Sequence, residues 1–210
     1  LIFNLRSIAY IATYLVIISC MAQDSITIVP SWEAEKIELN HTYGDSFSFS
    51  KIRFYISNVR FYNEELNENY LSKKQAYLMD ISNVQTLKIP TPDSFHFTHH
   101  RFNLGIDSNS NSQGALSEDL DPIHGMYWTW QSGYINTKIE GSRGDEKFTY
   151  HLGGYSFPYN ASQEVMLPVS SKILPFQLQA IGYIDQLNIM RPSNEAIYLS
   201  EKIAQSFNSK

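Results

Sequence analysis

The side chains best suited to chemistry in this sequence are its histidines and a tryptophan-rich stretch that follows one of them. The six histidines are His41, His96, His99, His100, His124 and His151. The one cysteine, Cys20, lies in an apolar N-terminal run, so the rest of the chain can form neither a disulfide nor a thiolate metal site. A transition metal would therefore depend on imidazole, carboxylate, amide, thioether or phenol donors.

The stretch from Leu120 to Tyr134 carries the densest group of such residues. Trp128 and Trp130 are two positions apart, so on a strand their side chains would point to the same face. His124 precedes both, which places an imidazole beside oxidisable aromatic rings. Paired tryptophans also occur in cores and at their rims, so packing is the competing interpretation.

Two other patterns suggest cation sites. On a strand, His96 and His100 would share one face and His99 the other, so the first two could bind a metal weakly or form a solvated face. The run that begins at Asp107 resembles the start of a calcium loop, but Ser112 stands where the EF-hand pattern has glycine.

Period-two alternation of apolar residues predicts that most of the chain forms β-strands. The predicted strands cover residues 51–56, 77–81, 95–99, 102–104, 134–140, 148–152, 165–169 and 176–180. Val59 and Phe61 fall out of phase with the apolar residues before them, which predicts a bulge near residues 57–58. Ile135 and Ile139 are expected to share one face of their strand.

The end of the chain predicts a helix. Apolar residues at helical spacing mark an amphipathic helix over residues 195–207, and residues 107–125 are expected to form one long loop. No internal repeat or linker is evident, so we expect one domain. The predicted fold is all-β, an antiparallel immunoglobulin-like β-sandwich with a C-terminal helix.

Composition and charge limit the classes of function. The 210 residues are 43% hydrophobic and 18% charged, with a formal net charge of −5, which excludes a disordered chain. The acidic balance argues against nucleic-acid binding, because phosphates attract basic surfaces. The sequence holds no glycine-rich phosphate loop, nucleophile elbow or HExxH motif, so it predicts no enzyme.

Residues 1–22 are expected to be an export signal. A basic residue precedes an apolar run over residues 8–18, which is short for a membrane span. Two processing routes stay open: cleavage before Gln23, or lipidation of Cys20 in a lipobox-like run, which would make a lipid anchor the one membrane contact. A retained transmembrane anchor is the third alternative. The mature domain, residues 23–210, is expected in the periplasm, on the cell surface or in the medium.

An ordered series of motifs resembles the MbnP-like family over about residues 25–207. The motifs are Ile52–Val59 (IRFYISNV), Phe102–Ser108 (FNLGIDS), Asp119–Pro122 (DLDP), Gly125–Asn136 (GMYWTWQSGYIN), Lys138–Gly141 (KIEG) and Phe148–Gly154 (FTYHLGG). The family includes the methanobactin-associated periplasmic protein and copper-repressible surface proteins of methane oxidisers. The resemblance implies a secreted or surface β-sandwich protein.

The resemblance also implies a copper site built from two histidines and an oxidised tryptophan, a kynurenine. The opened indole offers a carbonyl and an aniline nitrogen as extra donors. His151, in the YHLGG motif, is the first candidate ligand, and Trp128 or Trp130 is the candidate for oxidation. A di-haem peroxidase-like partner is implied as the oxidant.

The resemblance does not identify the second histidine ligand directly. In at least one copper-binding relative a histidine follows the modified tryptophan by two residues, whereas Trp130 and Ser132 occupy the corresponding positions here. His124 is the nearest second histidine. His41 is the alternative partner of His151 if His124 lies at the other end of the sandwich.

The sequence therefore predicts an exported, non-enzymatic copper-binding protein. The alternative is a surface binding or interaction module on the same scaffold, without metal.

Overall fold

The structure is a computed structural model that describes residues 24–44, 46–130 and 133–207. The strands are β1 (Ser25–Trp32), β2 (Glu35–Lys36), β3 (Thr42–Tyr43), β4 (Phe47–Asn63), β5 (Glu68–Leu71), β6 (Ala76–Asp80), β7 (Lys88–Pro90), β8 (His99–Leu104), β9 (Tyr127–Trp128), β10 (Gly133–Arg143), β11 (Glu146–Gly153), β12 (Tyr155–Ser156), β13 (Tyr159–Asn160), β14 (Gln163–Pro168), β15 (Ile173–Gln177) and β16 (Asn188–Ile189). The helices are α1 (Ser108–Ser112) and α2 (Asn194–Ser206), with 3-10 turns η1 (Glu118–Leu120), η2 (Pro122–His124) and η3 (Gln179–Tyr183).

The predicted export signal, residues 1–22 with Cys20, lies outside the described residues. Among the described helices, none has both the length and the apolar character needed to cross a membrane.

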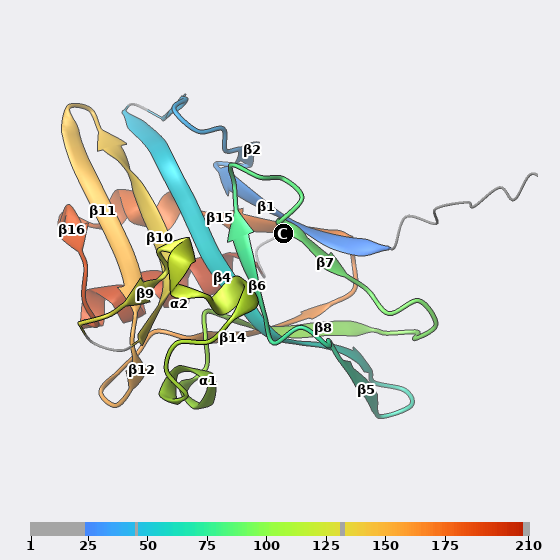
Figure 1. Cartoon of the computed structure of the whole chain (residues 1–210). Coiled ribbons are helices and arrows are strands. Elements are labelled where there is room, and N and C mark those ends of the chain that lie inside the picture. The colour runs from blue at the N-terminus through green and yellow to red at the C-terminus, as the bar shows by residue number, and fades with distance from the viewer. Residues whose placement is uncertain (1–23, 45, 131–132, 208–210) are drawn as a thin grey trace, which may run out of the picture.

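Two β-sheets form a sandwich (Figure 1). The large sheet has the order β14-β8-β4-β10-β11-β16, with β3, β5 and β6 also paired to β4 and β9 paired to β10. The smaller sheet has the order β15-β1-β2, with β7 also paired to β1. Most neighbours are antiparallel, while β1 with β15 and β11 with β16 are parallel. The predicted all-β sandwich with a C-terminal helix is confirmed.

Strand β4 is the longest strand and joins the two halves of the large sheet. Residues 47–54 pair with β10, and residues 56–62 pair with β8. The register with β8 shifts between Ser57 and Arg60, and Asn58 has a φ of 52°, so the predicted bulge is confirmed. Because the bulge restores the phase, the apolar side chains before and after it face the same core.

The main core lies between the two sheets and α2. Phe54 of β4 and Phe176 of β15 stack with their ring centroids 4.1 Å apart. The Ser193 side chain accepts a hydrogen bond from the backbone N–H of Ala196 and so caps α2. The apolar stripe of α2 packs into this core, which confirms the helix predicted over residues 195–207.

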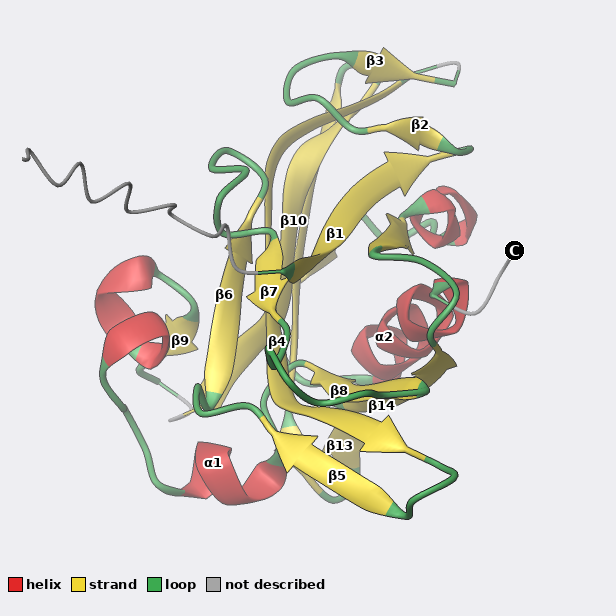
Figure 2. Cartoon of the chain, turned by 90° about the vertical axis from the view of Figure 1, so that its right-hand side faces the viewer, coloured by secondary structure: helices red, strands yellow, loops and turns green. Residues whose placement is uncertain are grey.

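The second face of the large sheet, opposite the main core, is covered as well. The covering segment, residues 106–130, packs Leu120, Met126 and Trp128 against Tyr55 of β4 in a smaller apolar cluster. Figure 2 shows β1 and α2 on one side of β4 and β10, and β9 with the short helical turns on the other. The expectation of one long loop over residues 107–125 is wrong, because α1, η1 and η2 lie within it.

Asp107 is a helix cap in this segment. Its carboxylate accepts hydrogen bonds from the backbone N–H groups of Asn109 and Ser110 and from the Asn58 side-chain amide. Since N–H donors hold the carboxylate at the start of α1, capping explains the Asp-Ser-Asn pattern that resembled a calcium loop.

Three expectations about strands are wrong in detail. Residues 95–98 are irregular and β8 begins only at His99, so the strand predicted over residues 95–99 is absent. Strand β15 ends at Gln177, where a turn leads into η3. A register shift in β10 places Ile135 in the smaller cluster and Ile139 in the main core, so the two do not share a face.

The stacked ring pair yields a stability prediction. Phe176→Ala should lower the free energy of unfolding by about 3–5 kcal/mol, because it removes a fully buried ring and leaves a cavity. Urea denaturation followed by circular dichroism measures the change. Tyr183→Ala, at a residue that is 81% exposed, serves as the control and should change stability by less than about 0.5 kcal/mol. Equal stability of the two variants would contradict the assigned core.

Candidate functional site

Four ionisable side chains form one row across the second face of the large sheet. His151 of β11 pairs with Lys138 of β10, Lys138 pairs with Arg53 of β4, and Arg53 pairs with Asp80 of β6. Cross-strand partners point to the same face of a sheet. The residues next to these four in sequence supply the main core, so the row lies on the opposite, second face.

His151 is held by a carboxylate within this face. Its side chain is almost buried, and Nε2 lies 3.0 Å from one oxygen of Glu140. The other oxygen of Glu140 accepts a bond from Lys51 at 3.1 Å. Glu140 and Lys51 were not among the residues predicted from the sequence, because their pairing depends on the register of three strands.

Burial and neighbouring charges set the protonation of this pair. Burial lowers the pKa of His151, the nearby Lys138 and Lys51 act in the same direction, and the hydrogen bond to Glu140 opposes them. Burial acts to raise the pKa of Glu140, but hydrogen bonds from His151 and Lys51 outweigh it and hold that pKa below its usual value. At neutral pH the site therefore holds a neutral imidazole beside an ionised carboxylate.

The Trp128 indole packs against β11 at Gly153, two residues from His151, because Gly153 has no side chain. A Cβ atom at Gly153 would stand 2.6 Å from Cζ3 of Trp128 and 2.7 Å from the carbonyl oxygen of Tyr134. Gly153 and His151 are alternate residues of β11, so they share a face and lie about 7 Å apart. The Trp128 indole, only 6% exposed, thus covers the strand beside the imidazole.

Trp130 is placed differently. Its ring centroid is 5.7 Å from that of Trp128, but its side chain is 65% exposed. It borders a separate surface hollow together with Met190 and Arg191. The two tryptophans are therefore in contact, with Trp128 buried over Gly153 and Trp130 facing outward.

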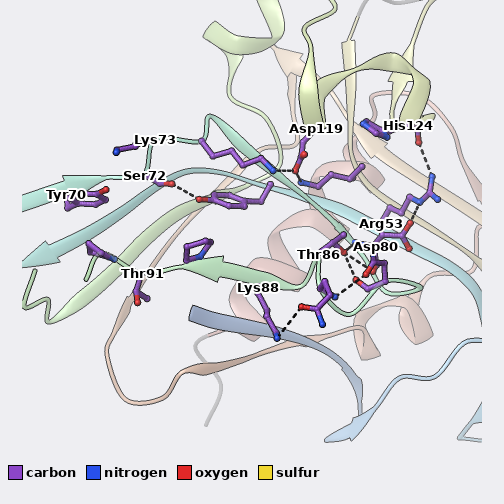
Figure 3. Close-up of a pocket in the computed structure, with 17 residues that line it drawn as sticks. Arg53, Tyr70, Ser72, Lys73, Asp80, Thr86, Lys88, Thr91, Asp119 and His124 are labelled. Atoms are coloured by element: carbon purple, nitrogen blue, oxygen red, sulfur yellow. Dashed lines mark hydrogen bonds and ion pairs between the residues drawn. The ribbon is translucent and has the colours of Figure 1, made fainter. Parts of the chain in front are cut away.

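His124 lies on η2, in the segment that covers the second face. Its backbone carbonyl accepts a bond of 3.0 Å from Arg53, and the next carbonyl, of Gly125, accepts a bond from Lys138 (Figure 3 shows the first). These bonds fix the His124 turn over the row that ends in His151. The His124 side chain is half-buried, with Nε2 2.9 Å from the carbonyl oxygen of Glu118.

The remaining histidines lie elsewhere. His41 is exposed at the β2–β3 end, where its ring packs against Tyr43. Strand β3 pairs with β4 at Ser48, five residues from Arg53 in the row, which corresponds to about 17 Å along a strand. The structure therefore does not bring His41 to His151.

The histidines at residues 96–100 do not form a joint ligand set. His96 is exposed in irregular chain, the His99 ring bonds to Thr98, and His100 is buried against Phe97. Within residues 24–44, 46–130 and 133–207, no group of three or more His, Cys, Asp or Glu side chains is arranged to hold a metal ion.

Comparison with known proteins identifies similar chains. A family model described as MbnP matches residues 22–188. A solved structure, MbnP from Methylosinus trichosporium, superposes with a TM-score of 0.55 and 11% sequence identity, covering 81% of this chain and 80% of that chain. No curated protein matches the chain. At this identity, the structural likeness establishes a shared fold.

The contact between Gly153 and Trp128 yields a second prediction. Gly153→Ala should displace the Trp128 indole and lower the free energy of unfolding by about 1–3 kcal/mol, because the added methyl group has no space. Tryptophan fluorescence and urea denaturation measure the two effects. Gly182→Ala, whose methyl group would meet Trp32 at an ordinary 3.8 Å, is the matched control. Unchanged fluorescence and stability in Gly153→Ala would refute the close packing.

Proposed function

The chain belongs to the MbnP family, and from this premise we propose that it is an exported protein that binds copper on the second face of its large sheet. The proposed ligands are His151, an oxidised Trp128 and His124. The observation that carries the proposal is the position of Trp128 over Gly153, next to an imidazole held by Glu140.

The pairing of His151 with Glu140 supports its role as a ligand. A metal-binding histidine usually donates its second ring N–H to a carboxylate, which orients the ring and increases its basicity. In His151 the contact with Glu140 occupies Nε2 and leaves Nδ1 as the proposed copper ligand. The lowered pKa of His151 favours the neutral imidazole that metal binding requires.

The proposed copper site needs a metal ligand other than histidine or carboxylate. The described residues offer no cluster of three such groups, and oxidation of Trp128 would supply a carbonyl oxygen and an aniline nitrogen beside His151. In this reaction the indole ring opens between C2 and C3, the C2 carbon is lost and one oxygen is gained overall. A di-haem peroxidase-like partner is the proposed source of the oxidising equivalents.

The two tryptophans suggest where that partner would act. Trp128 is almost buried, whereas Trp130 is exposed and in ring contact with it. We propose Trp128 as the oxidised residue because it packs on Gly153, two residues from His151 on the same face of β11, and Trp130 as the surface that the partner meets.

His124 is the proposed second imidazole. The turn that carries it is fixed to the row by Arg53 and Lys138, and its Nδ1 makes no hydrogen bond to other described residues. His41 is not included, because it lies at the other end of β4. The proposed role is binding of copper rather than catalysis.

Mass spectrometry of the natively exported protein tests the oxidation. The peptide that contains Trp128 should be heavier by about 4 Da than its sequence predicts, the mass difference between kynurenine and tryptophan. Trp128→Phe should remove this shift and stoichiometric Cu(I) binding, while Trp130→Phe should leave copper affinity intact once the modification has formed. An unmodified peptide from a copper-free protein would instead favour the alternative, a surface binding module without metal.

Substitutions at the histidine–carboxylate pair test the ligand assignment. His151→Ala should abolish stoichiometric Cu(I) binding, and Glu140→Gln should weaken it about 10- to 100-fold by loosening the ring. Competition with a chromogenic Cu(I) chelator measures both. His96→Ala, at an exposed histidine on another part of the fold, is the control and should bind as the unmodified chain does. Full binding by His151→Ala would exclude it as a ligand.

A further inference from the structure

A groove opens beside the second face, where β6 and β7 approach each other (Figure 3). Its volume is about 730 Å³, within the range of small-molecule sites. Residues 70–78 line one wall and residues 83–92 the other, with Arg53 and His124 at one end. The proposed copper ligand His151 does not line it.

The groove has a positive charge in an acidic protein. Four cationic side chains and two acidic ones line it, an excess of two positive charges, whereas the whole chain carries −5. Asp80 is paired with Arg53 and Asp119 with Lys74, each at 2.7 Å. A concave site with one dominant sign of charge concentrates the potential, so this groove favours an anion.

Two lysines remain available to such an anion. Lys73 makes no ion pair or hydrogen bond with other described residues. Among the described residues, the Lys88 amine donates one long hydrogen bond, of 3.4 Å, to the side-chain amide oxygen of Gln85. They lie on different walls, as Figure 3 shows. A ligand that satisfied both would need negative charges at separate points.

The other lining groups suit a ligand with many hydroxyl groups. The side-chain N–H donors of Asn83 and Gln85 make no hydrogen bond to other described residues, and both border the groove. The rings of Tyr70 and Tyr77 add flat apolar surface, and the Tyr77 hydroxyl is fixed by Ser72 at 2.6 Å. Donors, aromatic surface and separated cations together match a carboxylated sugar.

We propose that this groove binds an acidic oligosaccharide. Its carboxylates pair with Lys73 and Lys88, and its hydroxyl groups accept hydrogen bonds from the amides of Asn83 and Gln85. The inference goes beyond copper binding, since no proposed metal ligand makes these contacts and the groove needs no metal.

Isothermal titration calorimetry of the copper-free protein with trigalacturonate tests the proposal. Trigalacturonate should bind with an affinity that falls as salt is added, and neutral maltotriose should bind at least about tenfold more weakly. The double variant Lys73→Gln/Lys88→Gln should lose at least about tenfold in affinity for trigalacturonate. Both lysines are exposed, so thermal unfolding should be unchanged.

A matched control separates the groove from general charge. Lys36→Gln/Lys147→Gln removes the same charge from exposed positions outside the groove and should retain binding. Equal weakening by the two double variants, or equal affinity for maltotriose, would overturn the proposal. Tighter binding of penta-aspartate would overturn the sugar assignment in favour of an acidic peptide. His151→Ala should bind trigalacturonate normally, so failure of copper binding and failure of sugar binding are distinguishable.

Discussion

Burial of both faces of the large sheet is the constraint on which the rest of the structure depends. A sheet with one solvent-exposed face can leave its charged side chains in water. Here residues 106–130 cover part of β4 and β10 opposite the main core and reach β11 at Gly153. A charge beneath such a cover is costly unless it is paired. Glu140 accordingly lies between His151 and Lys51, and Lys138 reaches the Gly125 carbonyl of the cover itself.

The same bonds that pair the partly buried charges also position the candidate site. Arg53 and Lys138 fix the turn that carries His124, and the absence of a side chain at Gly153 lets the Trp128 indole rest on β11. The motif around His151 therefore supplies both an imidazole and the space for the ring beside it. The hydrogen bonds of Arg53 and Lys138 and the packing of Trp128 on Gly153 therefore act on the same part of the second face.

The covering segment also separates two chemical environments. On the β11 side, the Glu140 carboxylate holds the neutral imidazole of His151, the proposed copper ligand. On the β6 side, Asp80 and Asp119 are already paired, and the lysines that remain give a positive groove. Arg53 lies at the boundary, because it bonds to both Asp80 and the His124 carbonyl. The same face of the sheet thus carries the proposed site for a copper cation on one side and the proposed site for an anion on the other.

The sequence by itself determined the β-rich sandwich, the bulge in β4 and the C-terminal helix. The alternation of apolar residues along strands and their helical spacing in α2 are local patterns, and each strand must bury its apolar side. The resemblance carried by an ordered series of motifs also singled out His151 as the first candidate ligand, but it left open whether Trp128 or Trp130 would be oxidised. The sequence missed Glu140 as the partner of His151 and Lys51 as the partner of Glu140, since their contacts depend on the register between neighbouring strands. The irregular chain at residues 95–98 and the division of Ile135 from Ile139 were also missed. The separation of His41 from His151 was decided by the tertiary structure alone, because the pairing of strands sets which side chains meet and sequence spacing does not record it.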